Sequence, residues 1–268
     1  MRFLYCTDLH GCDYKYEAIL KYALEHKINL IHLGADILPK GSDILGIQKY
    51  FTKNYLKNFY QRAKENGIDV LAFFGNDDLY SRKKYFKEYA QLLDEVAFEK
   101  EGYIFKAYGY VPDYKFGLKT ACKLDYPGWT CPEKYIGKPV DFTDKGRVLI
   151  DDPVQYFLNK GTIKEDLNKI SVDYKTIMAI HCPPRFMGMD VCYDKQEVGS
   201  KSVFDFIATK RPLLALFGHI HESPEVTGIW DDKIGKTWVL QPGQRQFFTT
   251  IVDIEIKDSW VNAKLIQI

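Results

Sequence analysis

The sequence lacks the features that mark several specialised classes of protein. Its 268 residues carry a formal net charge of only +1, so no global electrostatic field draws the chain onto nucleic acid or a membrane surface. No apolar run approaches the ~20 residues that a transmembrane helix needs. Internal repeats and low-complexity segments are also missing. What is left is the composition of an ordinary globular protein, with 46% hydrophobic and 27% charged residues.

The cysteines give no sign of a disulfide framework. The six cysteines form no C-x-x-C pair, and no secretory signal precedes the first strand pattern at residues 2–6. We therefore expect a cytoplasmic protein with reduced thiols and no membrane association.

Strand patterns alternate with helix patterns in the first third of the chain. The expected strands cover residues 3–6, 29–33 and 70–74, and the expected helices cover 14–26, 44–65 and 81–93. Because such alternation builds βαβ units, it predicts a largely parallel sheet.

The middle of the chain is less regular. Residues 102–145 are expected to form an irregular excursion from the main fold. Within it, residues 102–117 have the pattern of a strand followed by a loop, and residues 119–140 show no pattern of a helix or strand. Helical spacing returns over residues 152–169.

The second half predicts further strands and one more helix. Strands are expected at residues 176–180 and 213–217, with a helix at 200–209. Apolar and polar residues alternate over 250–256 and 260–266, which predicts antiparallel strands of a second sheet. We therefore expect one α/β domain over residues 1–268, with two mixed β-sheets packed face to face as a sandwich flanked by helices.

Five short polar motifs follow the apolar runs, each where a strand is expected to end. They hold four of the six histidines and are Asp8-x-His10, Gly34-Ala35-Asp36, Gly75-Asn76-Asp77-Asp78, His181 and Gly218-His219-Ile220-His221. In an open α/β sheet, the loops at the carboxyl ends of the strands form the ligand site. The motifs therefore predict one shared site.

The residue types in these motifs are those that bind divalent metal ions. Two ions about 3.5–4 Å apart need a shared ligand, and a carboxylate can bridge them. Carboxylate, amide and imidazole donors suit Mn, Fe, Zn, Ni or Co, so the identity of the metal stays open. The predicted ligands are Asp8, His10, Asp36, Asn76, His181, His219 and His221.

The order of the motifs resembles that of the calcineurin-like metallophosphoesterase superfamily, which runs D-x-H, G-D, G-N-H-[DE], H and G-H-x-H. Two further segments, Gly109-Tyr110-Val111-Pro112 and the region of Tyr126-Pro127, resemble a smaller subgroup of compact bacterial and archaeal phosphoesterases. The resemblance implies the metallophosphoesterase fold and hydrolysis of phosphate esters through attack by a metal-bridging hydroxide. It also implies two ligand sets that share a bridging Asp36: Asp8, His10 and His221 for one ion, and Asn76, His181 and His219 for the other.

The sequence departs from the superfamily pattern in three places. Ala35 stands where many members have glycine, and the gap from Asp36 to Asn76 is long, which we assign to an extended helix. Asp77 stands where many members have a histidine that helps to protonate the leaving group. We count Asp36, Asn76 and Asp77 as candidate catalytic residues and expect a narrow substrate range. Asp78 is expected to cap a helix or to orient a metal ligand.

Basic residues outside the motifs have both a functional and an ordinary interpretation. Arg185 is a candidate bidentate donor to a substrate phosphate, and the alternative is a solvated loop arginine. Lys49, Lys53 and Lys57 share one helix face that would suit nucleic acid, but a solvated helix face is the favoured interpretation.

The sequence favours an enzyme that hydrolyses phosphodiesters. A diester carries one fewer negative charge than a monoester, and no cluster of Lys or Arg accompanies the motifs. The expected substrate is a small phosphate ester, with nucleotides among the candidates. A non-enzymatic metal-binding scaffold on the same fold is the alternative, and the complete set of seven ligands favours the enzyme. The sequence does not indicate an oligomeric state.

Overall fold

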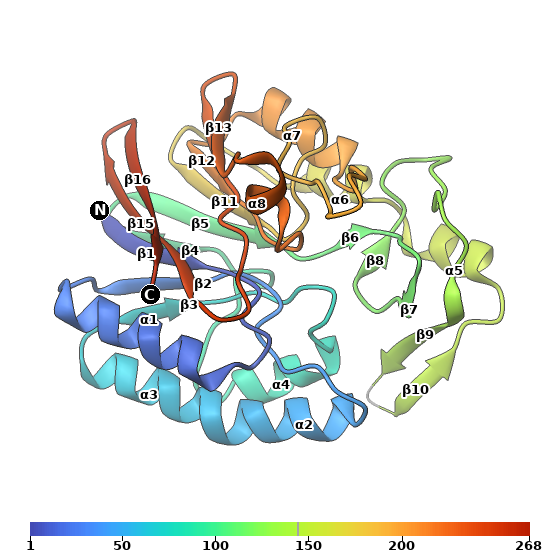
Figure 1. The fold of residues 1–268 in the computed structure, drawn as a ribbon, viewed down its shortest axis with the longest axis horizontal. Coiled ribbons are helices and arrows are strands. Elements are labelled where there is room, and N and C mark those ends of the chain that lie inside the picture. Colours follow the sequence, from blue (N-terminus) through green and yellow to red (C-terminus); the bar gives the residue numbers. More distant parts are fainter. Residues whose placement is uncertain (144) are drawn as a thin grey trace.

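Two mixed β-sheets form the centre of the molecule, and helices cover their outer faces (Figure 1). The computed structural model describes residues 1–143 and 145–268. The first sheet contains, in spatial order, β16 (Trp260–Gln267), β15 (Thr250–Lys257), β1 (Arg2–Cys6), β2 (Leu30–Leu33) and β3 (Asp69–Leu71). The second contains β13 (Asp231–Ile234), β14 (Thr237–Leu240), β12 (Leu214–Leu216), β11 (Thr176–Ile180), β5 (Tyr103–Tyr108) and β4 (Phe98–Lys100). The predicted sandwich is confirmed.

Side-chain alternation in β1 explains why the two sheets stack. Successive residues of a strand point to opposite faces. Phe3 and Tyr5 belong to the core between the sheets, where the Phe3 ring meets the Phe105 ring edge-on at 5.4 Å. Leu4 and Cys6 face the other way and pack among residues of the covering helices. These four of the five β1 residues are fully buried, so the strand contributes to both core layers.

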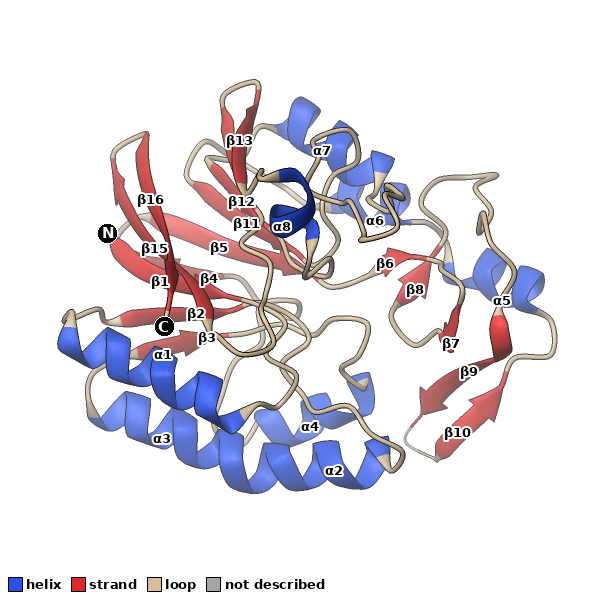
Figure 2. Ribbon diagram, viewed as in Figure 1, coloured by secondary structure: helices blue, strands red, loops and turns tan. Residues whose placement is uncertain are grey.

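Helices of the first half cover the outer face of the first sheet. They are α1 (Asp13–Glu25), α2 (Ile44–Phe51) and α3 (Lys57–Glu65), and a π-helical turn at Thr52–Leu56 joins α2 to α3. The long helix predicted over residues 44–65 is therefore confirmed. On the second sheet, α6 (Ile163–Lys169) and α7 (Lys201–Lys210) supply the covering layer, and Figure 2 shows the helices outside the strands.

The helix predicted over residues 81–93 is wrong beyond residue 86. Only a 3₁₀ turn at Tyr80–Arg82 and the short α4 (Lys83–Phe86) form. Leu92 instead makes a parallel bridge with Ala72, and the Leu93 N–H donates to the Ala72 carbonyl at 2.8 Å. Both leucines are buried. Their burial at the edge of the first sheet explains why the chain is extended there and does not continue the helix.

The prediction that the C-terminal strands belong to a second sheet is wrong. β15 pairs antiparallel with β1, in a register that places Arg2 opposite Glu255, and β16 pairs with β15. The alternating pattern identified a strand, but it carried no information about which sheet the strand would join. In the structure residues 250–254 are all buried, so both faces of this part of β15 are covered.

The segment predicted as helical over residues 152–169 forms two helices, α5 (Pro153–Lys160) and α6. Gly161, with φ of +71°, ends the first helix. Thr162 begins the second with a capping box, in which its hydroxyl accepts from the Glu165 N–H and the Glu165 carboxylate accepts from the Thr162 N–H.

Residues 103–108 of the predicted excursion form β5 of the second sheet, and residue 144 lies outside the described residues. Residues 111–143 and 146–149 form a small lobe beside the sandwich, at the right of Figure 1. Its strands are β6 (Val111–Pro112), β7 (Phe116–Leu118), β8 (Cys122–Lys123), β9 (Ile136–Thr143) and β10 (Gly146–Leu149). The expectation of no regular element in residues 119–140 is therefore wrong. A fully buried ion pair, Lys119 Nζ to Asp113 Oδ1 at 2.8 Å, anchors the lobe, and the Tyr135 hydroxyl donates to the same carboxylate at 2.6 Å.

Over the described ranges 1–143 and 145–268, no helix is both long enough and apolar enough to cross a membrane.

Candidate metal centre

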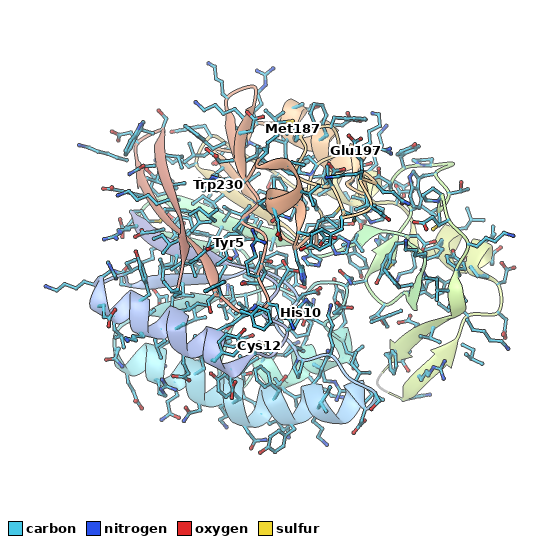
Figure 3. The ribbon with its side chains drawn as sticks, in the orientation of Figure 1. Tyr5, His10, Cys12, Met187, Glu197 and Trp230 are labelled. Carbon is cyan, nitrogen blue, oxygen red and sulfur yellow. The ribbon has the colours of Figure 1, made fainter. Side chains whose placement is uncertain are left out.

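The five motifs converge on one region because all follow strands that end on the same side of the sandwich. Asp8 and His10 follow β1, Asp36 follows β2, and Asn76 comes after β3. His181 follows β11, and the motif with His219 and His221 follows β12. Figure 3 labels His10 and Cys12 near the centre of the molecule, where these loops meet. Both sheets therefore contribute to the site.

Four of the predicted ligands adopt a backbone conformation that side chains normally avoid. Asp8, His10, Asp36 and His219 have φ values of 58°, 46°, 54° and 70°, and they make up four of the ten non-glycine residues with positive φ in the described ranges. Such a conformation costs about 1–2 kcal/mol per residue. Backbone hydrogen bonds between motifs hold it, such as Asp8 N–H to the Ala35 carbonyl at 3.0 Å. The strain concentrates at the candidate site.

Glycines in the motifs make room for the two carboxylates. A Cβ built on Gly218 would lie 2.5 Å from Asp8 Oδ2, and one on Gly75 would lie 2.3 Å from Asp36 Oδ1. Neither position accepts a side chain without moving a carboxylate. Ala35, one of the departures from the superfamily pattern, is buried in the core between the sheets, so its methyl group is accommodated.

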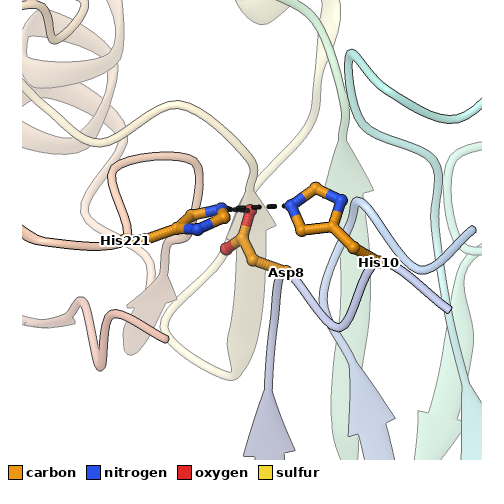
Figure 4. A group of neighbouring side chains, drawn as sticks. All are labelled: Asp8, His10 and His221. Carbon is orange, nitrogen blue, oxygen red and sulfur yellow. Dashed lines mark hydrogen bonds and ion pairs between the residues drawn. The ribbon is translucent and has the colours of Figure 1, made fainter. Parts of the chain in front are cut away.

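The first group of candidate ligands is Asp8, His10 and His221 (Figure 4). His221 Nε2 lies 3.3 Å from Asp8 Oδ1 and 3.1 Å from His10 Nε2. The Nε2 atoms of the two imidazoles therefore face each other, and the Asp8 carboxylate lies beside them. A cation held by all three groups accounts for this arrangement, since metal ligands direct their lone pairs toward one point.

The second group is Asp36, His181 and His219, with Asn76 beside it. His181 Nε2 lies 3.3 Å from Asp36 Oδ2 and 2.8 Å from Asn76 Oδ1, and the rings of His181 and His219 are 4.9 Å apart. Asp36 also joins His10 and Asp77 in a third group of potential ligands. Asp36 therefore links the two groups, which is the position that a bridging carboxylate needs.

The electrostatics of the site keep the carboxylates ionised. Burial alone would raise the pKa of Asp8 and Asp36, but His221 beside Asp8 and His181 beside Asp36 outweigh burial and lower both pKa values. Burial, reinforced by His181, lowers the pKa of His219 to about 3. Anionic carboxylates and a neutral imidazole are the forms that bind metal. Burial would lower the pKa of His181, but Asp36 raises it to about 9, so metal binding there would release a proton.

Asp77 and Asp78 have different surroundings. Asp77 Oδ2 pairs with Lys40 Nζ at 2.6 Å, and burial together with Asp36 raises the pKa of Asp77 to about 6. Asp78 is fully buried and accepts from the backbone N–H groups of Ile37 at 3.2 Å and Leu38 at 2.7 Å. Asp78 therefore holds the segment after Asp36 and does not cap the following helix, where no side-chain cap is present.

Two orienting residues lie near the candidate ligands: Gln241, whose Gln241-Pro242-Gly243 segment resembles a turn found after the last motif in many members of the superfamily, and Tyr114, which the sequence analysis missed. Gln241 Nε2 donates to the carbonyls of Gly218 at 2.7 Å and Ile220 at 3.0 Å, which fixes the loop that carries His219. The Tyr114 hydroxyl accepts from Asn76 Nδ2 at 3.2 Å, and its ring meets the His219 ring edge-on. Nothing in the sequence marks Tyr114, because it comes from the irregular excursion.

The candidate basic residues outside the motifs have ordinary surroundings. Arg185 Nε lies 3.9 Å from Glu197, and the side chain is 43% exposed. The basic helix face is likewise engaged with its neighbours: Lys57 faces Glu88 at 3.6 Å and Lys53 lies over the Tyr85 ring. For the lysines, these contacts favour the interpretation as a solvated helix face. For Arg185, they show a carboxylate partner, Glu197, that is not one of the candidate ligands.

Comparison with solved structures identifies the class of the fold. The protein TT1561 of Thermus thermophilus is 17% identical, with a TM-score of 0.57 over 98% of this chain and 97% of that one. A dimetal phosphatase from Danio rerio is 9% identical, with a TM-score of 0.56 over 99% of this chain and 95% of that one. At these identities the likeness concerns the fold, which is the metallophosphoesterase fold. No curated protein matches the chain.

The family follows from the sequence itself. A model of the family described as calcineurin-like phosphoesterase matches residues 1–223, most of the chain. The protein therefore belongs to the calcineurin-like phosphoesterase family, and it is a metal-dependent hydrolase of phosphoric ester bonds. This membership supports the enzyme over the non-enzymatic scaffold.

Proposed function

We propose that the protein is a binuclear phosphodiesterase. The observation that carries the proposal is the pair of ligand groups linked by Asp36, one formed by Asp8, His10 and His221 and the other by Asp36, His181 and His219. Two metals are also named for the Danio rerio phosphatase that shares the fold. The metal identity stays open among Mn, Fe, Zn, Ni and Co, because the donor set suits all of them.

The chain's own residues would hold the two ions as follows. One ion takes the first group with Asp36, and the other takes the second group with the Asn76 amide oxygen. When bound, the ions supply Lewis acidity that activates water and neutralises charge on the phosphoryl oxygens. Asp36 would be the ligand shared by the two ions, and the Asn76 amide is held between His181 and the Tyr114 hydroxyl.

The charge around the ligands supports a diester over a monoester. Lys40 faces the cluster, and its Nζ is paired with the Asp77 carboxylate at 2.6 Å. Arg185 faces Glu197. A phosphate monoester would bring a second negative charge, and neither of these cations is free to balance it. A diester brings only one charge, which the two ions can balance.

Asp77 is the proposed residue on the leaving-group side of the site. It directly follows Asn76, and its carboxylate lies in one group with His10 and Asp36. The ion pair with Lys40 and the hydrogen bond from the Asp77 N–H to Asp36 Oδ1 at 2.9 Å fix its position. We infer that Asp77 takes the place of the histidine present in many relatives, which restricts the substrates to those with good leaving groups.

The test compares two esters with the same leaving group. The manganese-loaded protein should hydrolyse bis-p-nitrophenyl phosphate with a kcat/KM at least 10-fold above that for p-nitrophenyl phosphate. The variant Lys40→Met provides a check on the charge argument, since it leaves the Asp77 carboxylate unpaired and should lower monoester turnover more than diester turnover. A higher kcat/KM for the monoester in the wild-type protein would overturn the preference for diesters and leave the phosphoesterase assignment in place.

A further inference from the structure

A cavity of about 720 Å³ opens beside the first ligand group. Its walls include Asp8, His10 and His221, the side chains drawn in Figure 4. The volume falls within the range of about 300–1,000 Å³ that small-molecule sites occupy. Because these three residues belong to the proposed metal centre, a molecule in the cavity would lie directly next to the reacting phosphate.

Three aromatic rings line the same cavity and are exposed to solvent. The exposed fractions are 78% for Phe247, 54% for Phe248 and 66% for Tyr193. Apolar surface gains free energy when it is removed from water, so exposed rings gathered around one cavity suit a flat ligand that covers them.

The loop that carries the two phenylalanines is tied to the motif region. The Tyr14 hydroxyl of α1 donates to the Gln246 carbonyl at 2.6 Å. Gln244 Nε2 donates to the carbonyl of Thr7, the residue before Asp8, at 3.0 Å. These bonds fix the loop relative to the first ligand group, so the rings lie at a set distance from the metal centre.

The basic residues of the cavity, Lys15 and Arg245, each have a partner within the protein. Lys15 Nζ donates to the Arg245 carbonyl at 2.6 Å, and the Arg245 guanidinium is ion-paired with Glu225. No basic track is therefore left for a second phosphate or for a polyanionic strand. Gln246 and Gln267 also line the cavity, and their amides can donate and accept hydrogen bonds. This wall suits a planar, uncharged ligand with polar edges.

We propose that the cavity binds the base of a nucleotide whose phosphodiester lies at the metal centre and whose 5′-monophosphate is the product. A nucleobase is planar and neutral, it stacks on aromatic side chains, and its edges carry hydrogen-bond donors and acceptors. Phe247 and Phe248 are the stacking residues. The inference rests on the proposed function, since it names the substrate class of the same site.

The experiment compares two ligands that differ only in the base. Binding of adenosine 5′-monophosphate and of ribose 5-phosphate to the full-length, manganese-loaded protein is measured by isothermal titration calorimetry. Stacking of one base predicts about 10-fold tighter binding of the nucleotide. In the variant Phe247→Ala/Phe248→Ala, the affinity for the nucleotide should fall to that for ribose 5-phosphate.

The control is Trp260→Ala. Trp260 is also exposed, at 56%, but it lies at the turn between β15 and β16 and not among the residues that line the cavity. This variant should keep the 10-fold difference. Equal affinities for the two ligands in the wild-type protein, or a difference that survives loss of both phenylalanines, would overturn the inference. Manganese-dependent binding of ribose 5-phosphate would then still support the metal centre, whereas its absence would count against the proposed function as well.

Discussion

His221 Nε2 lies 3.3 Å from Asp8 Oδ1, which joins the last motif of the chain to the first. The contact is possible because β1 and β12 lie in different sheets of the sandwich and end on the same side. The proposed site thus spans the two sheets, and its integrity depends on their packing.

The first prediction concerns that contact. His221→Ala removes one imidazole from the first ligand group, so metal content should fall from two ions per chain toward one. Phosphoesterase activity should fall by more than the 10–100-fold that is typical for loss of an outer-shell partner of a metal site. His26→Ala is the matched control, because His26 is exposed at the end of α1 and stacks on Tyr22. Two bound ions in His221→Ala, measured by elemental analysis, would contradict the assignment.

The second prediction concerns Tyr114. Tyr114→Phe removes the hydroxyl that accepts from Asn76 Nδ2 at 3.2 Å but keeps the ring against His219. The affinity for one of the two ions should fall 10–100-fold, because the amide loses its orientation. Calorimetric titration of the metal-free protein with manganese measures this directly. Tyr174→Phe, on an exposed tyrosine, should bind manganese like the wild type. Unchanged affinity in Tyr114→Phe would show that Tyr114 does not position Asn76.

The third prediction concerns the anchor of the small lobe. Lys119 and Asp113 form a fully buried pair at 2.8 Å, so Lys119→Met leaves an uncompensated buried carboxylate. Such a loss costs about 3–5 kcal/mol. Lys201→Met, which breaks the exposed pair with Asp205, should cost less than about 1 kcal/mol. Urea unfolding measures both. Equal effects in the two variants would refute the anchoring role.

The fourth prediction concerns pH. Burial lowers the pKa of Lys160 to about 8, below the value of about 10.4 for an unfolded lysine. Between these two values the unfolded state binds more protons than the folded state, so the free energy of unfolding rises with pH through this window. Lys160→Met removes the titrating group. The difference in unfolding free energy between wild type and variant should therefore shift in favour of the wild type from pH 8 to pH 10, and a constant difference would contradict the argument.

The sequence predicted those parts of the fold and site that depend on local patterns. Motifs at strand ends could be placed because a strand and the loop after it are adjacent in the chain, and the structure brings all seven predicted ligands to one region. Metal binding by these residues is still a prediction. The sandwich was predicted as a class, although the C-terminal strands that suggested its second sheet join the first sheet.

The features that the sequence did not reveal depend on contacts between distant segments. β15 joins β1 because its buried face completes the first sheet, a choice that its alternating pattern does not encode. Leu92 and Leu93 leave the expected helix because they are buried at the sheet edge. Tyr114 reaches Asn76 from an irregular segment, and only the folded lobe brings the two together.

The most direct test of the central claim is the metal content and activity of Asp36→Asn beside the wild-type protein. Asp36 links the two ligand groups, so its replacement should remove the bridge between the ions. Both proteins are stripped of metal, reconstituted with manganese, and assayed by elemental analysis and by hydrolysis of bis-p-nitrophenyl phosphate. The account predicts two ions per chain and clear turnover in the wild type, with both reduced in the variant. If the wild-type protein bound two ions but hydrolysed no substrate with any divalent metal, the result would contradict the account and favour a metal-binding scaffold.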